Sequence, residues 1–352
     1  KSEGLRELKS HKIFKQEWTE FPRTIFGQEE VQERLIKILT GFARNGQADK
    51  LVLLFGPNGS AKTSLLRALF EGIEAYSNTD EGTLFHFNWV FPSDLDLKSK
   101  LGITHQDSSL EKESSFAKLA QSKVGAVLRS ELHENPLFLI PKEEREELFK
   151  IWLDNLKDPE SIETFQRQKN HFLKGELSHK NAIIYEALLN EYSGDLQKVL
   201  RHVRVERLYL NNRFRRGLVS IDPQMGVDAQ IRQVTLDQSM ANLPPALQSL
   251  NLFQLEGDLI DGNRGLIQYN DLLKRPVEAF KYLLGTCESG HVNLGHIVAF
   301  LDTVFLASTN DRQLDAFRQH PEFYSFKSRL ELIRVPYFRK YSDEAKIYRD
   351  TA

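Results

Sequence analysis

The segment LVLLFGPNGSAKTSLLRALF, from Leu51 to Phe70, constrains the fold more than any other part of the sequence. Its first residues are all apolar, as in a central parallel strand that is buried on both faces. After Lys62, apolar residues return at helical spacing. The order of strand, glycine-containing turn and helix predicts an α/β core whose turn holds phosphate groups.

The turn GPNGSAKT comes close to the G-x-x-x-x-G-K-[ST] pattern of phosphate loops, with Ala61 in place of the second glycine. The Ala61 methyl group fits if that residue keeps helical φ. We expect Lys62 to reach the β- and γ-phosphates and the Thr63 hydroxyl to bind Mg²⁺; an ordinary turn is the alternative. The predicted nucleotide-binding residues of the turn are Gly56, Pro57, Asn58, Gly59, Ser60, Ala61, Lys62, Thr63 and Ser64.

Length and composition limit the class of protein. A chain of 352 residues can bury a large core and form more than one domain. The formal net charge of −2 and the absence of a long apolar run do not indicate a nucleic-acid or membrane binder. Cys287 is the single cysteine, so we expect a buried thiol in a cytoplasmic protein. Because the chain begins at Lys1 rather than Met, we expect a piece of a longer protein.

Two segments outside the phosphate loop point to an AAA+ ATPase core. Phe26 and Gly27, just before a predicted amphipathic helix, resemble the adenine-side segment of that fold. The candidate for its second acidic strand, GNRGLIQYNDLLKR, comes much later in the chain than in a minimal AAA+ core. We therefore expect core residues 1–92, a mainly helical insertion over 93–255, and the remainder of the core over 256–352.

Four stretches together resemble one family, the PrkA-type serine protein kinases, whose N-terminal portion is an AAA+ module related to MoxR-like ATPases. They are GPNGSAKTSL, LHENPLFLIP, GNRGLIQYNDLLKRPVEAFKYLL and FKSRLELIRVPY. The resemblance implies a cytoplasmic ATP-binding protein linked to stress or nutrient responses. It also implies that the AAA+ lid and a kinase-like region lie beyond Ala352.

The second strand departs from the AAA+ pattern of four apolar residues followed by Asp-Glu. Asn270 falls at the Asp position, which normally holds the Mg²⁺ shell, and Asp271 falls at the Glu position, which polarises the attacking water. Asn270 brings no charge, and Asp271 is one methylene shorter than Glu. Thr63, Asn270 and Asp271 are the predicted metal residues, and ATP binding is better supported than ATP hydrolysis.

Two further residues complete the predicted catalytic group with Asp271. Asn310 ends the apolar strand DTVFLASTN and resembles sensor 1, although a strand-terminal turn residue is the alternative. Arg329 stands where related AAA+ modules carry an arginine finger that acts on a neighbouring subunit, which implies a homo-oligomeric ring or filament. An exposed structural arginine is the alternative for Arg329. Arg264 could orient the site or the insertion.

Three functions fit these features. The favoured one is an ATP- and Mg²⁺-binding module that regulates or energises a kinase-like region. No H-R-D or D-F-G segment occurs, so the chain itself is not a classical protein kinase. The second is a MoxR-like remodelling ATPase, or a component of an ATP-dependent protease, acting on a client protein. The third is a nucleotide-gated scaffold without hydrolysis. We expect no membrane partner and no nucleic acid, although the insertion carries a basic cluster: Arg201, Arg204, Arg207, Arg213, Arg215 and Arg216.

Overall fold

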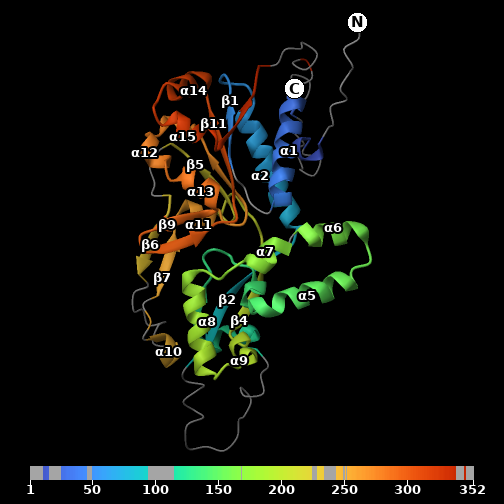
Figure 1. Ribbon diagram of the computed structural model, residues 1–352, viewed down its shortest axis with the longest axis vertical. Coiled ribbons are helices and arrows are strands. Elements are labelled where there is room, and N and C mark those ends of the chain that lie inside the picture. The colour runs from blue at the N-terminus through green and yellow to red at the C-terminus, as the bar shows by residue number, and fades with distance from the viewer. Residues whose placement is uncertain are drawn as a thin grey trace, which may run out of the picture.

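The computed structural model describes residues 11–15, 25–45, 50–93, 115–167, 169–223, 228–233, 243–248, 250, 252–337 and 345. These residues form two bodies, one above the other in Figure 1. The upper body holds a parallel sheet between helices, and the lower body holds an antiparallel sheet covered by helices. No helix of the described residues is long and apolar enough to span a membrane.

The sheet of the upper body, called the core sheet below, has the strand order β12-β1-β11-β8-β5. Every neighbouring pair in it is parallel, so the predicted parallel α/β sheet is confirmed. The segment predicted as the sensor strand is β11, next to β1, and the segment predicted as the second strand is β8, on the other side of β11. The five strands are β1 (Leu51–Phe55), β5 (Leu218–Ile221), β8 (Leu266–Tyr269), β11 (Val304–Thr309) and β12 (Leu330–Arg334).

The alternation of side chains along β1 explains the layers on both faces of the core sheet. Leu51 and Leu53 pack into one apolar cluster, whereas Val52 and Leu54 pack into another. Helices α1 (Glu29–Asn45) and α2 (Lys62–Ser77) cover the second cluster. The first cluster is covered by α11 (Asp258–Asp261), α12 (Val277–Phe280), α13 (Leu283–Ser289), α14 (Asp311–Arg318) and α15 (Phe323–Lys327). Cys287 is buried there, as predicted.

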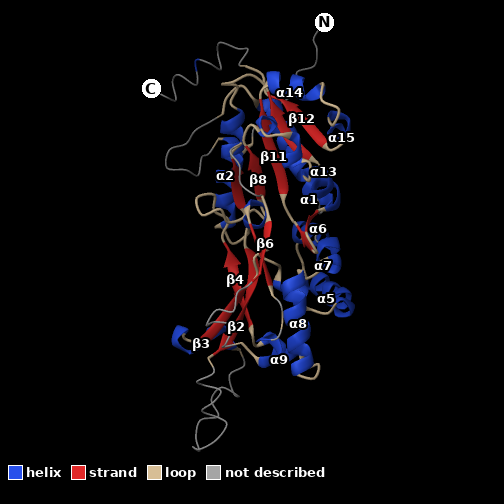
Figure 2. Cartoon of the chain, turned by 90° about the vertical axis from the view of Figure 1, so that its left-hand side faces the viewer, coloured by secondary structure: helices blue, strands red, loops and turns tan. Residues whose placement is uncertain are grey.

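The lower body has its own apolar core around the antiparallel sheet β3-β2-β4. Phe87, Trp89 and Phe91 alternate along the central strand and pack against Ile184 and Leu188 of α8. Figure 2 shows this sheet below the core sheet. The elements are β2 (Leu84–Pro92), β3 (Val124–Arg129), α5 (Lys142–Asn155), α6 (Pro159–Arg167), α7 (Lys169–Lys174), α8 (His179–Glu191), α9 (Leu196–Leu200), β4 (Val203–Leu208) and α10 (Pro245–Gln248).

Two antiparallel pairs accompany the upper body. The pair β6–β7 precedes α11, and the hairpin β9–β10 directly precedes β11. Their strands are β6 (Gln230–Gln233), β7 (Phe253–Glu256), β9 (His291–Leu294) and β10 (Ile297–Phe300). Short 3-10 helices are η1 (Lys12–Phe14), η2 (Phe116–Lys118), η3 (Gln121–Lys123), η4 (Pro136–Leu139) and η6 (Leu272–Lys274).

Two strands lie on the other side of the boundaries predicted at residues 92 and 255. Strand β2 falls within the expected first core segment but pairs with β3 and β4 in the lower body. Strand β5 falls within the expected insertion but forms the edge of the core sheet beside β8. The chain therefore leaves the core after α2 and returns to it at Leu218. The described residues of the span between them form five α-helices together with the three-stranded sheet.

Candidate nucleotide site

The predicted phosphate loop lies at the carboxyl end of β1 and leads into α2. Gly56 has φ 153°, and a Cβ there would lie 2.2 Å from the Val335 carbonyl oxygen, so no other residue fits. Ala61 has φ 69° and ψ 16°, which is left-handed backbone. The expectation that Ala61 keeps helical φ is therefore wrong. The loop needs the glycine-like conformation of the pattern, and the methyl group is held in it.

Lys62 is 9 % exposed, and its ammonium group turns back into the loop. The Nζ atom donates to the carbonyl oxygens of Gly56 and Pro57, each at 2.8 Å. Burial lowers the pKa of Lys62, while the charges of Asp271 and Asp311 raise it. Two carboxylates from neighbouring strands therefore act electrostatically on the loop lysine.

The predicted adenine-side segment lies against the predicted phosphate loop through the adjacent Gln28. Gly27 has φ 71°, and its N–H donates to the Glu29 Oε1 atom at 3.2 Å. The Gln28 amide Nε2 donates to the carbonyl oxygens of Pro336, at 2.7 Å, and Ser60, at 3.4 Å. Gln28 is 2 % exposed, and its Oε1 atom has no hydrogen-bond partner among the described residues. Phe26 itself is half-buried.

Tyr337, beyond β12, also contacts the loop. Its hydroxyl group donates to the Asn58 carbonyl oxygen at 2.8 Å, and its side chain is exposed. Thr63 and Ser64 are exposed in the first turn of α2. Loop, adenine-side segment and the residues after β12 thus meet at one edge of the core sheet.

Asn270 follows β8 at this edge, but its amide is engaged toward the outer strand. Its Nδ2 atom donates to Asp222 Oδ1 at 2.9 Å, and its Oδ1 atom accepts from Gln268 Nε2 at 2.5 Å. An ionised carboxylate can only accept, so Asp222 requires the NH₂ side of Asn270 to face it. Both polar ends of Asn270 therefore have protein partners.

Asp271 takes a left-handed conformation with φ 45° and ψ 48°. Its N–H donates to Ser308 Oγ at 3.2 Å, and its carboxylate forms an ion pair with Lys274. The turn after Asp271 is held by Arg275. Both η-nitrogens of its guanidinium group donate to the buried Asp228 carboxylate, at 3.0 and 2.9 Å. The backbone of the predicted base is thus held at this edge, and its carboxylate is paired with a lysine.

Asn310, the predicted sensor, ends β11 and begins α14. Its Oδ1 atom accepts from the Gln313 N–H at 2.8 Å, so it caps the helix. The sequence reasoning missed its neighbour Asp311, which is half-buried at the same edge and acts on Lys62. The signal was present in STND, since an acidic residue directly follows the sensor asparagine.

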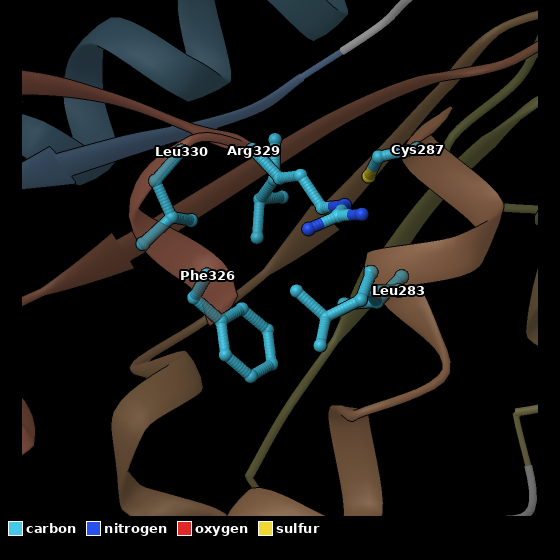
Figure 3. Close-up of a pocket in the computed structure, with 7 residues that line it drawn as sticks. Leu283, Cys287, Phe326, Arg329 and Leu330 are labelled. Atoms are coloured by element: carbon cyan, nitrogen blue, oxygen red, sulfur yellow. The ribbon is translucent and has the colours of Figure 1, made fainter. Parts of the chain in front are cut away.

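Arg329 lies at the opposite end of the core sheet. Its carbonyl oxygen accepts from Leu51 N–H, at the start of β1, whereas the phosphate loop follows the end of β1. The Arg329 Nε atom donates to Glu288 Oε2 at 3.0 Å, and Nη1 donates to the Ser325 carbonyl oxygen at 3.0 Å. In Figure 3 the side chain extends past Leu283 and Cys287, beside Leu330. The structure does not bring it to the other site residues within one chain.

Arg264 and two arginines of the basic cluster have protein partners away from the loop. Arg264, with φ 64°, donates to the carbonyl oxygens of Phe85 and His133, so it connects the turn before β8 to the lower body. In the basic cluster, Arg204 donates to the Ala117 carbonyl and Arg215 pairs with Asp258. Such contacts support a structural interpretation of the cluster, and the expectation of no nucleic-acid partner stays a prediction.

Among the described residues, no group of three or more His, Cys, Asp or Glu side chains could hold a metal ion by itself. A metal bound at this edge would therefore depend on oxygen atoms from a nucleotide, as Mg²⁺ in phosphate-transfer sites commonly does. Thr63 offers an exposed hydroxyl group, and Asp271 and Asp311 offer carboxylates. The available groups fit a nucleotide–Mg²⁺ complex better than a metal ion alone.

The sequence pattern of the family described as "PrkA AAA domain" matches residues 105–351. The chain is 24 % identical over 353 residues to "ATP-dependent protease PrkA" of Bacillus subtilis (strain 168), covering 99 % of this chain and 45 % of that protein. It is 28 % identical over 94 residues to "Serine/threonine kinase YeaG" of Escherichia coli (strain K12), covering 26 % of this chain and 15 % of that protein. The chain thus spans less than half the length of these relatives.

Proposed function

Because the chain belongs to the PrkA AAA domain family, we propose that it binds ATP and Mg²⁺ as an AAA+ module, with slow or regulated ATP hydrolysis at subunit interfaces. One observation carries the proposal: the buried ammonium of Lys62 ends inside a glycine-containing loop between a central parallel strand and a helix N-terminus. Backbone N–H groups and a lysine in this arrangement bind the β- and γ-phosphates of a nucleotide.

The residues around the loop have separate roles in this proposal. Lys62 leaves the carbonyl oxygens of Gly56 and Pro57 and contacts phosphate oxygens, while Thr63 binds Mg²⁺. Gln28, with an unpartnered buried oxygen beside the loop, is placed to receive the amino group of adenine. Asn310 keeps its Nδ2 atom for the γ-phosphate while its oxygen caps α14. When bound, Mg²⁺ neutralises charge on the transferred phosphoryl group.

We propose that Arg329 acts on the nucleotide of a neighbouring subunit. About 17 Å of strand separates it from the loop of its own chain, given the 5 residues of β1 and a rise of roughly 3.3 Å per residue. An arginine finger in trans requires head-to-tail packing of subunits. The placement of Arg329 at the far end of the core sheet supports the proposed homo-oligomer.

The names of the relatives favour two uses for such a module. "Serine/threonine kinase YeaG" supports a module that regulates a kinase-like region in a longer protein. "ATP-dependent protease PrkA" supports the second candidate, a module that drives a client protein toward proteolysis or remodelling. One observation favours this second candidate: Val298 and Phe300 are 41 % and 55 % exposed on the hairpin β9–β10, directly before the sensor strand. Exposed apolar residues on a hairpin can bind apolar side chains of an extended polypeptide.

The experiment that tests the proposal is ATP binding and ATP turnover by the purified chain over a range of protein concentrations. We expect saturable, Mg²⁺-dependent ATP binding that Lys62→Ala abolishes, and turnover per chain that rises as the protein assembles. Saturable ATP binding that is unaffected by Lys62→Ala would place the nucleotide elsewhere and refute the proposal. ATP binding through Lys62 without turnover at any concentration would leave a nucleotide-gated scaffold.

A further inference from the structure

The residue that should carry negative charge beside the γ-phosphate is missing from its usual strand. Asn270 is neutral and its amide is engaged by Asp222 and Gln268. Asp271 is paired with Lys274, three residues later in the same turn. A carboxylate in an ion pair presents less charge and fewer free lone pairs to a water molecule. The second strand therefore has no uncommitted carboxylate at this edge.

Asp311 provides such a carboxylate from the neighbouring strand. Strand β11 lies between β1 and β8, and Thr309 is level with Phe55, the last residue before the phosphate loop. Asp311 is two residues further on, half-buried, in the first turn of α14. No hydrogen bond or ion pair joins its carboxylate to another described residue, and its charge, like that of Asp271, acts on the Lys62 ammonium.

A purely structural role for Asp311 explains less. An acidic residue in the first turn interacts favourably with the helix dipole. However, Asn310 already caps α14 through the Gln313 N–H, and α14 has only eight residues. A helix of that length does not require a second acidic residue that is half-buried beside the phosphate-loop lysine.

Resting on the proposed function, we propose that Asp311, rather than Asp271, is the catalytic carboxylate that orients the water attacking the γ-phosphate of ATP. The water oxygen forms a bond to the γ-phosphorus, and the bond from that phosphorus to the β,γ-bridging oxygen breaks. Both water protons end on the released phosphate, giving ADP and dihydrogen phosphate. Asp311 accepts a hydrogen bond from the water, and its charge is placed against the γ-phosphate rather than the β-phosphate.

Two matched variants, Asp311→Asn and Asp271→Asn, test this inference, with Asp315→Asn on the same helix as the control. Binding of ADP and of a non-hydrolysable ATP analogue is measured with Mg²⁺ for each protein. Removing a negative charge that faces the γ-phosphate should tighten the analogue by about 3–10-fold while ADP changes by less than about 2-fold. Asp271→Asn and Asp315→Asn should change neither affinity by more than about 2-fold.

Turnover gives the second half of the test. Asp311→Asn should lower ATP turnover by about 100-fold, and Asp271→Asn by less than about 10-fold. If turnover of the unaltered chain is too slow to measure, the binding comparison decides alone. If the Asp311→Asn variant keeps the same preference for the ATP analogue over ADP as the unaltered chain, the inference is overturned. It is also overturned if Asp271→Asn, rather than Asp311→Asn, tightens binding of the analogue and leaves ADP binding unchanged. Weaker Mg²⁺-dependent binding in Asp311→Asn would also overturn it, by assigning the residue to the metal. Failure of the unaltered chain to bind ATP would instead refute the proposed function.

Discussion

The two ends of the core sheet carry different chemistry. At the carboxyl end, the loop after β1 meets Asn270, Asp271, Asn310 and Asp311 from the two neighbouring parallel strands. At the amino end lie two arginines, of which Arg264 binds the lower body and Arg329 lies at the surface beside Glu288. In a parallel sheet all strands end at the same edge, so the ligand-binding groups collect there. The groups at the amino end can contact only a domain or subunit that packs against that end of the sheet.

The largest expected effect is on the carboxyl end. Lys62→Ala removes the ammonium that ends inside the loop and should weaken ATP binding by about 100-fold or more. The check is an ATP titration by calorimetry or a fluorescent analogue. Lys281→Ala is the matched control, because Lys281 is an exposed lysine paired with Glu322 and should leave affinity unchanged.

A similar loss of affinity in Lys281→Ala would mean that removing a lysine disturbs the chain generally.

At the amino end, Arg329→Ala should lower turnover on the order of 1,000-fold without weakening ATP binding, because a finger acts on the transition state of the neighbour's nucleotide. Arg329→Lys should recover only a small part, since an ammonium lacks the planar donor fork. Single-turnover rates and ATP affinities of both variants provide the measurement. A loss of affinity equal to the loss of turnover would show that Arg329 supports folding or ground-state binding instead.

Acidic pH should lower the stability of the lower body, which Arg264 connects to the amino end of the core sheet. Burial lowers the pKa of His133 and of His202 to about 4. The neutral His202 ring lies between the Val90 carbonyl oxygen, at 3.1 Å, and the Tyr192 hydroxyl group, at 2.8 Å. Above pH 6.5 both rings are neutral in the folded and unfolded chains. Below it the unfolded chain binds protons that the folded chain cannot, so the free energy of unfolding falls toward pH 4, by up to about 3 kcal/mol for each histidine.

Urea unfolding at several pH values between 7.5 and 4.5 measures this loss. His202→Gln should show a shallower pH dependence than the unaltered chain. Glu134 is buried in the same body, and burial raises its pKa, which acts in the opposite direction as pH falls. An unfolding free energy that does not fall between pH 6.5 and 4.5 would contradict the assignment of buried neutral histidines.

The connection between the two bodies can be broken at Arg264. Arg264→Met removes the donor for the carbonyl oxygens of Phe85 and His133 and should lower the free energy of unfolding by roughly 2–3 kcal/mol. Calorimetry should then resolve the lower body as an earlier transition. The exposed Arg232, paired with Glu256, provides the control, and Arg232→Met should change stability by about 0.5 kcal/mol or less.

Equal destabilisation by Arg264→Met and Arg232→Met would show that Arg264 has no special place at the junction.

The smallest effect concerns the loop backbone. Ala61 holds φ 69°, which costs a residue with a Cβ about 1 kcal/mol relative to glycine. Ala61→Gly should therefore raise the thermal midpoint slightly and restore the usual loop pattern, with ATP affinity nearly unchanged. Ala61→Val should do the opposite on both counts, since a β-branched side chain is far less compatible with positive φ. A lower midpoint for Ala61→Gly would mean that the added freedom of the unfolded chain outweighs the relief of strain.

The sequence predicted the elements around the phosphate loop better than it predicted which other strands belong to the core sheet. Local patterns sufficed for β1, the loop and α2, because a buried strand, a special turn and an amphipathic helix are each recognisable alone. Strand β5 was missed, since the short segment LVSI after Gly217 is recognisable as a core strand only by its pairing with β8. Strand β2 fell within the expected core residues 1–92, because local sequence does not say which sheet a strand joins.

Within the candidate site, position along the chain predicted which residues meet, but not how they are paired. Asn270 and Asp271 do lie at the expected edge, yet Asp222 and Lys274 engage their polar atoms. Asp311 was overlooked because its neighbour Asn310 matched the sensor 1 pattern, whereas Asp311 matched no pattern. Such pairings depend on side chains from separate strands, which spacing alone cannot supply.

The most direct test of the account is a mixing experiment with Lys62→Ala and Arg329→Ala chains. Each variant alone should be inactive, the first because it cannot bind ATP and the second because it offers no arginine to its neighbour. In a mixed assembly, the intact loop of an Arg329→Ala chain meets the intact arginine of a Lys62→Ala chain, so turnover should reappear. A mixture that assembles and still hydrolyses no ATP would contradict a site shared between subunits.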